Sequence, residues 1–508
     1  MVFGISIVII LIFVLWGALA PVQFASVTDA VYSYSISNFG WFYLLATFLF
    51  LLFSFYLAFS KYGRIRLSQN DERPVYTLVS WFAMLFSAGM GIGLVFWGAA
   101  EPLSHYLLPP EGAEPGTSEA ARLAMRYSFF HWGLHPWAVY TVISLCLAYF
   151  QFRKGKKGLI SATFEPLLKD KVNGPIGKLI DTLAVIATVF GVATSLGLGT
   201  LQIAGGFNHL LGWPNSLGTQ IGIILVVTVL FLISATSGLD KGIKLLSNTN
   251  LIIAVVLMLF VFVMGPTAFI METLTESFGG YVQNLIQMSL RLTPFSGGSW
   301  VGTWTLFYWA WWIAWAPFVG TFIARISKGR TIREFVLGAL LVPSMFGCIW
   351  FAVFGGTGLK MQIFDGVPLA EAVQKDTTAA LFMTLEQLPW GTFLTGVAIV
   401  LITIFFITSA DSATFVLGML TSDGKLNPSN RVKITWGVLQ SAIAMVLLIS
   451  GGLGALQTAS IIAALPFAVI LCLMCVSLYI ALRAEDQQRK EQEKHKRAKV
   501  EKLLRDHA

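Results

Sequence analysis

Long apolar stretches recur along the whole chain, separated by short polar segments. Twelve of them are long enough to cross the roughly 30 Å hydrocarbon core of a bilayer as α-helices. They cover about residues 3–20, 41–60, 76–100, 126–152, 178–208, 217–236, 247–270, 299–324, 334–356, 390–420, 433–450 and 455–482. The pattern predicts an all-α polytopic membrane protein with 12 transmembrane helices. Because no basic leader precedes the first stretch, we expect it to be a span rather than a cleavable signal peptide.

Composition agrees with this class of protein. Hydrophobic residues make up 56% of the chain and charged residues 12%, with a mean hydropathy of +0.74. Soluble proteins carry about twice that charged fraction, so an ordinary soluble protein is excluded. The four cysteines, Cys146, Cys348, Cys472 and Cys475, all fall inside apolar stretches, and we expect them to be small buried hydrophobes rather than metal or redox groups.

Lys and Arg are distributed unevenly between the segments that join the predicted spans. With both termini in the cytoplasm, 29 of the 34 basic residues fall on cytoplasmic segments. Such asymmetry follows the positive-inside rule, and it predicts cytoplasmic termini in a protein of the cell membrane. The formal net charge of +8 is then a topology signal and requires no nucleic-acid partner.

Two predicted spans contain residues that interrupt helices. Residues 87–93 read Ser-Ala-Gly-Met-Gly-Ile-Gly, and the eighth span contains Pro317 and Gly320. Spans 3–7 and 8–12 would then be two repeats of opposite orientation, the plan of transporters that bind solutes between broken helices. The expected organisation is a transmembrane domain over 1–482, with repeats at about 76–270 and 299–482. Close helix packing is the alternative explanation of the glycines, because Gly-x-x-x-Gly also serves that purpose.

Two polar regions lie outside the spans. Residues 483–508 carry 9 basic and 6 acidic residues, and we expect a charged cytoplasmic tail, helical or partly disordered. The simpler role for this tail is to anchor the topology through its positive charges, and the alternative role is a regulatory sensor. Residues 273–291 have apolar positions at helical spacing, which predicts an amphipathic helix on the outer face.

Tryptophan is concentrated in the eighth span. Six of the sixteen tryptophans fall within residues 300–315, and Trp304, Tyr308, Trp311 and Trp315 share one face of a helix with Trp312 beside them. Stacked indole faces attract quaternary ammonium groups, which carry charge but no N–H. An aromatic belt at the headgroups is the alternative, but a belt is about one turn deep, whereas this stripe covers three turns. We therefore favour a cation cage.

The fourth span supplies a second aromatic set. Residues 131–137 read His-Trp-Gly-Leu-His-Pro-Trp, and Tyr140 shares a face with Trp137. His131 and His135 are one turn apart, a spacing that metal ligands can have, but no third ligand type follows nearby. No transition-metal site is expected here.

Three motifs together make the chain resemble the betaine/choline/carnitine transporter family. They are Gly-Met-Gly-Ile-Gly at 89–93, His-Trp-Gly-Leu-His-Pro-Trp at 131–137, and Phe-Tyr-Trp-Ala-Trp-Trp-Ile-Ala-Trp-Ala-Pro-Phe-Val-Gly at 307–320. The resemblance extends from the first predicted span to the twelfth. It implies a LeuT-type inverted repeat preceded by two amino-terminal helices, alternating access and a homotrimer. It also implies that the protein transports a solute and is not an enzyme.

The resemblance also implies binding residues. The trimethylammonium box would consist of Trp132, Trp137, Tyr140 and Trp312, and Trp311 and Trp315 would line the cavity. The substrate carboxylate would approach the glycine stretch, with Gly89, Met90, Gly91 and Gly93. The aromatic gates would be Phe96, Phe307 and Phe322. Members that accept choline tend to carry an acidic residue where this chain has Gly93, so glycine favours a zwitterion.

The coupling ion implied by the resemblance is sodium. One site would use carbonyls of Ser87, Met90 and Phe405 with the side chains of Thr408 and Ser409. A second site would use Thr188 and Phe318, but Val192 replaces a threonine of the family there, which puts that ion in doubt. Sodium-independent exchangers of the family place an arginine in the ion region, and residues 186–205 contain no Lys or Arg. We therefore expect sodium symport of glycine betaine or a related compatible solute, for osmoprotection, with no cofactor besides Na⁺.

Alternatives remain for this function and for the other polar residues. A sodium-independent carnitine or betaine exchanger would share the aromatic cage. A membrane-embedded enzyme would have to use His131, His135 or Asp411 as its base. Asp411 could equally serve a hydrogen bond between helices. Glu101 and Arg325 fit either gate salt bridges or plain placement near the ends of their spans.

Overall fold

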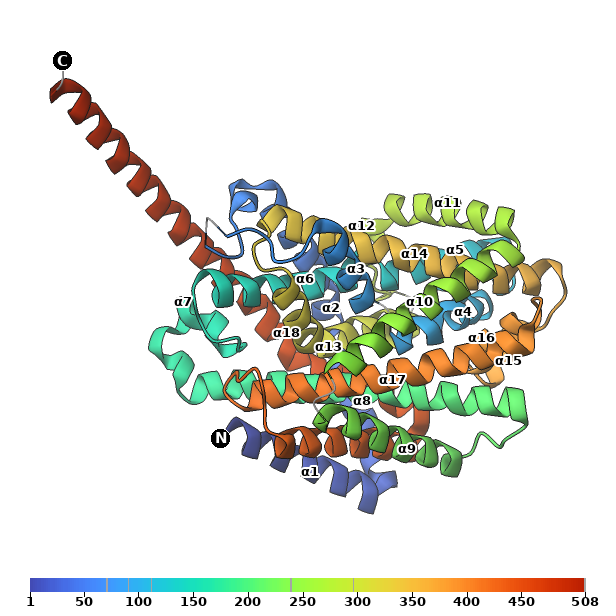
Figure 1. Ribbon diagram of the computed structural model, residues 1–508. Helices are drawn as coiled ribbons and strands as arrows, with labels where there is room; N and C mark the ends of the chain where they lie inside the picture. The colour runs from blue at the N-terminus through green and yellow to red at the C-terminus, as the bar shows by residue number, and fades with distance from the viewer. Residues whose placement is uncertain (70–71, 90, 111, 238–239, 296, 507–508) are drawn as a thin grey trace.

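The structure is a computed structural model that describes residues 1–69, 72–89, 91–110, 112–237, 240–295 and 297–506, and the side-chain surroundings of all of these except 88–89, 240–245 and 499–506. Helices dominate the described residues, whose only β-structure is a single bridge between Arg66 and Thr331. The helices gather into one bundle, from which the carboxyl-terminal part of α18 extends away (Figure 1). An all-α fold is therefore confirmed.

The α-helices of the first half are α1 (Val2–Leu19), α2 (Pro21–Phe59), α3 (Leu78–Gly89), α4 (Ile92–Leu107), α5 (Ser118–Trp132), α6 (Leu134–Ala148), α7 (Glu165–Leu168), α8 (Pro175–Leu211) and α9 (Leu217–Thr236). Those of the second half are α10 (Asp240–Met264), α11 (Thr267–Gln283), α12 (Leu285–Ser289), α13 (Phe307–Ile326), α14 (Ile332–Phe364), α15 (Leu369–Lys375), α16 (Ala379–Glu386), α17 (Gly391–Thr421) and α18 (Asn430–Asp506). Single tight turns are η1 (Lys61–Arg64), η3 (Ser161–Phe164) and η4 (Lys169–Asn173), and wide π turns are η2 (Tyr149–Arg153) and η5 (Gly302–Leu306).

Ten helices in the described part of the chain are long and apolar enough to cross a membrane, and α3 with α4 forms one more span if taken as a bent pair. The last two predicted spans both lie within α18, which is interrupted at Gly451 and Gly452. Gly452 has φ 59° and ψ −132°, a combination that only glycine adopts readily. The glycine at this position is therefore what permits the bend. A polytopic membrane protein is thus confirmed, while the count of 12 and the paired repeats stay predictions.

The two predicted breaks have different outcomes. The glycine stretch does interrupt its span, because α3 ends at Gly89, α4 begins at Ile92 and the two axes differ by 65°. The break expected at Pro317 is wrong, since α13 continues through that residue to Ile326. The irregularity of this span lies instead at its amino end, in the π turn η5. Packing of α13 against α6, α8 and α18 keeps the helix continuous although Pro317 donates no backbone hydrogen bond.

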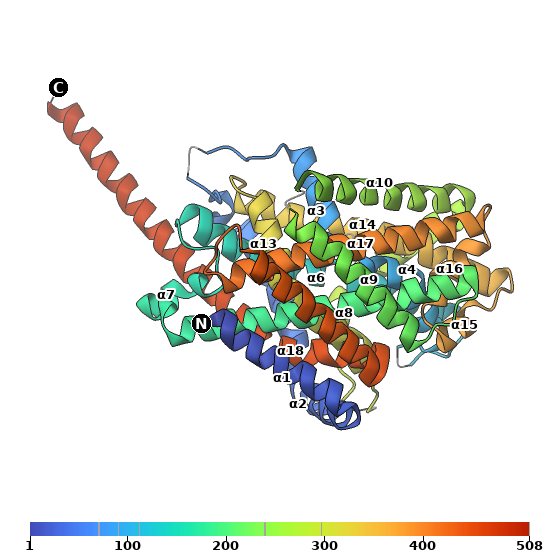
Figure 2. The same cartoon turned by 60° about the horizontal axis from the view of Figure 1, so that its bottom comes forward.

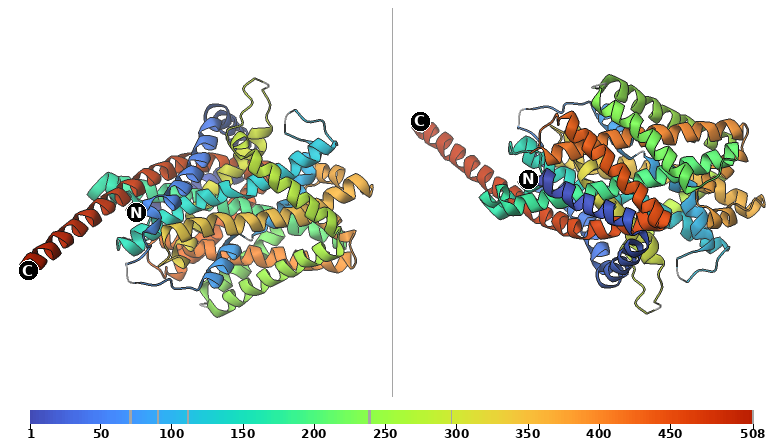
Figure 3. Two further views of the ribbon diagram at one scale, coloured as in Figure 1. Left: turned by 90° about the horizontal axis from the view of Figure 1, so that it is seen from above. Right: turned by 90° about the horizontal axis from the view of Figure 1, so that it is seen from below.

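Segments outside the bundle follow the predictions in outline. The amphipathic segment forms α11 and α12, with α11 packed on α5 and α14. At one side of the bundle, α1 packs against α8 and α18 (Figure 2). The charged tail is helical to Asp506 and stands clear of the bundle in both views of Figure 3.

Where the tail leaves the bundle, two acidic residues bind it to neighbouring basic side chains. Glu485 accepts hydrogen bonds from Tyr149 at 2.7 Å and from Lys154 at 2.8 Å. Asp486, which is 3% exposed, pairs with Lys61 at 2.5 Å. The first turn of the tail is therefore fixed to η1, which follows α2, and to the η2 region, which follows α6.

Candidate functional site

A cavity lies where α4, α5, α6, α8, α13 and α14 meet, inside the bundle. Its walls are largely aromatic, and most of the lining side chains are buried. The lining residues are Gly91, Ile92, Gly93, Leu94, Trp132, Pro136, Trp137, Tyr140, Ser195, Trp311, Trp312, Trp315, Pro343, Phe346 and Gly347. Eight of the ten predicted substrate-binding residues are in this set, which brings the glycine stretch and both aromatic sets to one place. Gly89 is not in the set and ends α3, and Met90 lies outside the described residues.

The four residues predicted to form the cation box are joined by a chain of ring contacts. Trp132 meets Trp312 edge to face, with centroids 4.8 Å apart and planes at 82°. Tyr140 meets Trp312 at 6.0 Å and 85°, and Trp137 meets Tyr140 at 5.4 Å and 78°. Each ring stands nearly perpendicular to the next, so faces and edges alternate around the cavity. Such an arrangement places the electron-rich faces where a cation without N–H groups can contact several of them.

The tryptophan stripe of α13 continues along the cavity. Trp311 stacks on Trp312 with centroids 5.1 Å apart and planes at 17°. Farther along, Trp315 donates its indole N–H to the carbonyl of Gly191 on α8, at 2.7 Å. The stripe therefore combines a face toward the cavity with hydrogen bonds that hold α13 against its neighbours.

The amino end of α4 forms another part of the cavity wall. Four successive residues, 91–94, line the cavity here, and the first turn of a helix has N–H groups that no residue of the helix accepts. Together with the helix dipole, these groups favour an anion. An aromatic box and a helix amino end facing one cavity match the two ends of a zwitterion.

Gly93 is the point where this wall approaches the aromatic rings. A Cβ atom at Gly93 would lie 2.3 Å from Cη2 of Trp311 and 3.1 Å from Cη2 of Trp132. No real Cβ makes the first of these contacts, so a larger residue requires the rings to move. At Gly91, by contrast, a Cβ would meet nothing within 4 Å.

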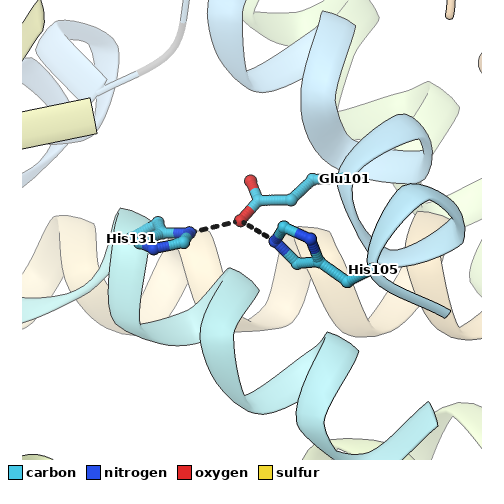
Figure 4. A group of neighbouring side chains, drawn as sticks. All are labelled: Glu101, His105 and His131. Carbon is cyan, nitrogen blue, oxygen red and sulfur yellow. Dashed lines mark hydrogen bonds and ion pairs between the residues drawn. The ribbon is translucent and has the colours of Figure 1, made fainter. Parts of the chain in front are cut away.

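A buried polar cluster lies directly behind the box, and residue patterns did not predict it. Glu101 on α4 is 0% exposed, and its Oε1 lies 2.7 Å from Nδ1 of His131 and 3.2 Å from Nε2 of His105 (Figure 4). Plain interfacial placement of Glu101 is therefore wrong, whereas a role as part of a gate stays a prediction. The only local signal was the spacing of Glu101 and His105, which are four residues apart on one helix.

Glu101, His105 and His131 also offer ligand atoms within 4.8 Å of one another, so the group has the composition of a metal site. His135 is not part of it, since its Nε2 pairs with Ser289 at 2.8 Å and its ring stacks on Trp309. His131 and His135, considered together as metal ligands from the sequence, therefore have different partners. Asp411 accepts from Ser234 on α9 at 3.1 Å, a bond between helices.

The predicted gate aromatics occupy different surroundings. Phe96 packs against Trp97, and Phe307 stacks on Trp311 at 5.6 Å, both buried beside the cavity rather than in its lining. Phe322 is 39% exposed near the other end of α13. Their positions on opposite sides of the tryptophan stripe are compatible with gates, a role that stays a prediction.

The predicted sodium ligands lie on separate helices. On α17, Thr408 donates to the carbonyl of Ile404 at 2.9 Å and lies 3.3 Å from that of Phe405, while Ser409 is half-buried. Ser87 is half-buried on α3, and Met90 lies outside the described residues. On α8, buried Thr188 donates to Ala184 at 2.7 Å and Val192 is buried, while Phe318 packs edge-on against Trp315. Both sodium sites stay predictions.

Comparison with known proteins agrees with this geometry. The family model described as BCCT, betaine/carnitine/choline family transporter, matches residues 1–487. A glycine betaine transporter of Bacillus subtilis, OpuD, is 54% identical over 97% of this chain and 96% of its own. An ectoine/hydroxyectoine transporter of Virgibacillus pantothenticus is 49% identical over 97% of this chain and 98% of its own. A glycine betaine transporter of Acinetobacter baylyi is 44% identical over 95% of this chain and 73% of its own.

The matched residues include every predicted span and all residues of the cavity, and the matching proteins are transporters rather than enzymes. The family resemblance inferred from three motifs is thereby confirmed. This chain belongs to the betaine/carnitine/choline family of membrane transporters.

Proposed function

We propose that the protein is a sodium symporter that imports glycine betaine, or a related zwitterionic compatible solute, across the cell membrane for osmoprotection. The observation that carries the substrate class is that the aromatic box and the amino end of α4 line the same cavity. The box suits a trimethylammonium group, and the helix end suits a carboxylate. The similarity to glycine betaine transporters supports the same choice.

The support for sodium coupling comes from the types of residue at the predicted ion site. Thr408 and Ser409 offer hydroxyl oxygens on α17, and hard oxygen ligands suit sodium. The predicted ion site also takes a carbonyl from Ser87, in the last turn of α3 before the break that precedes the cavity wall. An ion bound there would stabilise the arrangement of that break, so ion and solute would favour each other's binding reciprocally.

We propose a homotrimer with both termini in the cytoplasm.

Uptake by the purified protein in proteoliposomes tests this function. An inward sodium gradient is expected to accelerate uptake of labelled betaine at least about tenfold over a potassium gradient of equal strength. Unlabelled betaine, ectoine, proline, carnitine and choline then serve as competitors. Betaine is expected to compete best and choline poorly, because choline lacks the carboxylate. A full rate without sodium would instead identify the exchanger, and preference for ectoine would place this chain with its ectoine-transporting relative.

Thr408→Val is expected to raise the sodium concentration that gives half-maximal uptake by about tenfold, or about 1.4 kcal/mol. Valine keeps the shape of threonine but removes the proposed oxygen ligand. Thr403→Val is the matched control, because Thr403 on the same helix donates to the carbonyl of Ile399, four residues back, as Thr408 donates to that of Ile404. Equal sodium dependence of the two variants, measured at saturating betaine, would remove Thr408 from the ion site.

A further inference from the structure

The carboxylate of Glu101 is surrounded by four hydrogen-bonding groups from three helices. Its Oε1 faces His131 and His105, while its Oε2 accepts from the indole N–H of Trp132 at 2.8 Å and from the hydroxyl of Tyr308 at 2.6 Å. A carboxylate offers about four acceptor positions, so this one is fully satisfied as an ionised group. Complete pairing is what allows a charge to persist where the side chain is 0% exposed.

One of the four groups belongs to the cation box. Trp132 lines the cavity, and the bond from its indole N–H to Glu101 fixes the rotation of the ring. The neighbouring box member is held at the same place, because Trp312 donates its N–H to the backbone carbonyl of His131 at 3.1 Å. His131 in turn is bound at both ring nitrogens, by Glu101 and by Thr305 at 3.0 Å. The two rings that meet at 82° are therefore fixed by one small network.

The bonds of this network to Trp132 and Trp312 use the polar edges of the two rings and not their faces. Indole N–H groups that lacked acceptors would be costly in this interior, and rings without these bonds could turn about their side-chain torsions. A cation that is bound by ring faces needs those faces in a fixed orientation before it arrives. The hydrogen bonds of Glu101 orient the rings in advance, although Glu101 itself does not line the cavity.

We propose that Glu101 is a positioning residue for substrate, one that acts through Trp132 and, by way of His131, through Trp312. This inference rests on the proposed function, because it assigns Glu101 to the affinity for the trimethylammonium group. Glu101 contacts the box from behind and does not contact the substrate. Its loss is expected to weaken substrate binding more than it slows the transport cycle.

Glu101→Met is the test, since methionine is close to glutamate in length and offers no comparable acceptor. The Michaelis constant for betaine in sodium-driven proteoliposome uptake is expected to rise at least about tenfold, with the maximal rate per folded protein within about threefold. Folded protein is quantified by fluorescence-detected size-exclusion chromatography. An unchanged Michaelis constant, or a loss confined to the maximal rate, would overturn the proposal.

Glu101→Gln is the conservative control. A glutamine oxygen can accept from Trp132 and Tyr308, while its NH2 group donates to Nδ1 of His131 and Nε2 of His105 in their other tautomers. His131 would then donate from Nε2 to Thr305, so every bond of the network survives without a charge. A Michaelis constant within about threefold of the original protein is expected. A rise as large as that of Glu101→Met would show that charge, not ring positioning, is what Glu101 supplies.

Trp132→Phe completes the test and does not depend on how Glu101 variants fold. Phenylalanine keeps an aromatic face but cannot donate to Glu101, so the Michaelis constant is expected to rise about threefold to tenfold. In the Trp132→Phe background, Glu101→Met should raise the Michaelis constant by a smaller factor than in the original protein, because only the route through His131 and Trp312 remains. Effects that simply multiply would refute the coupling. If the unsubstituted protein fails to transport betaine, the proposed function fails; if it transports betaine and these variants retain its Michaelis constant, only this inference fails.

Discussion

Trp312→Ala is expected to raise the half-saturation concentration for betaine uptake by about fivefold to thirtyfold. Trp312 is the member of the box that touches both Trp132 and Tyr140, with centroid separations of 4.8 and 6.0 Å. Removing it takes away one cation-binding face and opens the contact between the others. A desolvated cation–π contact is worth about 1 to 2 kcal/mol, which corresponds to that range.

Two further substitutions separate the ring face from general packing. Trp312→Phe keeps a smaller face and is expected to fall between the original protein and Trp312→Ala. Trp309→Phe is the matched control, since Trp309 is fully buried on the same helix but stacks on His135 and does not line the cavity. Uptake kinetics and direct betaine binding by tryptophan fluorescence provide the measurements. The cage hypothesis is refuted by a Trp312→Ala variant with unchanged half-saturation, or by equal effects at both positions.

The aromatic half of the site was predictable because helical periodicity states which side chains share a face. Trp311, Trp312 and Trp315 needed only the 3.6-residue repeat and a reason for indoles to gather. The break between α3 and α4 was predictable for a similar reason, because closely spaced glycines leave the backbone poorly supported. The error at Pro317 shows the limit of such arguments. A proline removes one hydrogen bond, and the packing of three neighbouring helices decides whether the helix bends.

Glu101 could not be placed from the sequence because three of its four partners, all except His105, lie on other helices. His131 is thirty residues away on α5, and Tyr308 is two hundred and seven residues away on α13. Periodicity identifies the face of a helix but not the helix that covers it. An acidic residue near the predicted end of a span is therefore read as interfacial until the tertiary arrangement shows it buried and fully paired.

The polar network changes what the tryptophan cluster means physically. A cage made only of apolar packing would be free to repack around solutes of several shapes. Here Trp132, Trp312 and Trp315 each donate an indole N–H to a defined acceptor, so ring orientation is set by hydrogen-bond geometry as well as by contact. If the proposed function holds, selectivity for a methylated ammonium group would then depend on buried polar residues that do not line the cavity.

Gly93→Ala is expected to be the most damaging single methyl group that can be added to the cavity. Its Cβ would lie 2.3 Å from Trp311 and 3.1 Å from Trp132, so both rings would have to shift away from α4. Trp132 is held by Glu101 and Trp311 is stacked on Trp312 and Phe307, so neither ring is a free end that yields cheaply. Overpacking of this kind costs about 1 to 3 kcal/mol. The half-saturation concentration for betaine should rise at least about tenfold.

Two other glycines show whether weaker betaine binding by Gly93→Ala comes from the steric clash or from the loss of a glycine as such. Gly91→Ala adds its methyl group to open space on the same wall, and Gly396→Ala does so within helix α17, away from the cavity. Half-saturation is expected to stay within about threefold for Gly91→Ala and unchanged for Gly396→Ala, with all three proteins monodisperse on size-exclusion chromatography. If Gly93→Ala binds betaine as tightly as Gly91→Ala, the rings are mobile, and a site preorganised by fixed indole orientations is contradicted. If only Gly93→Ala weakens binding, the close approach of α4 to the two tryptophans sets the shape that the solute must fit.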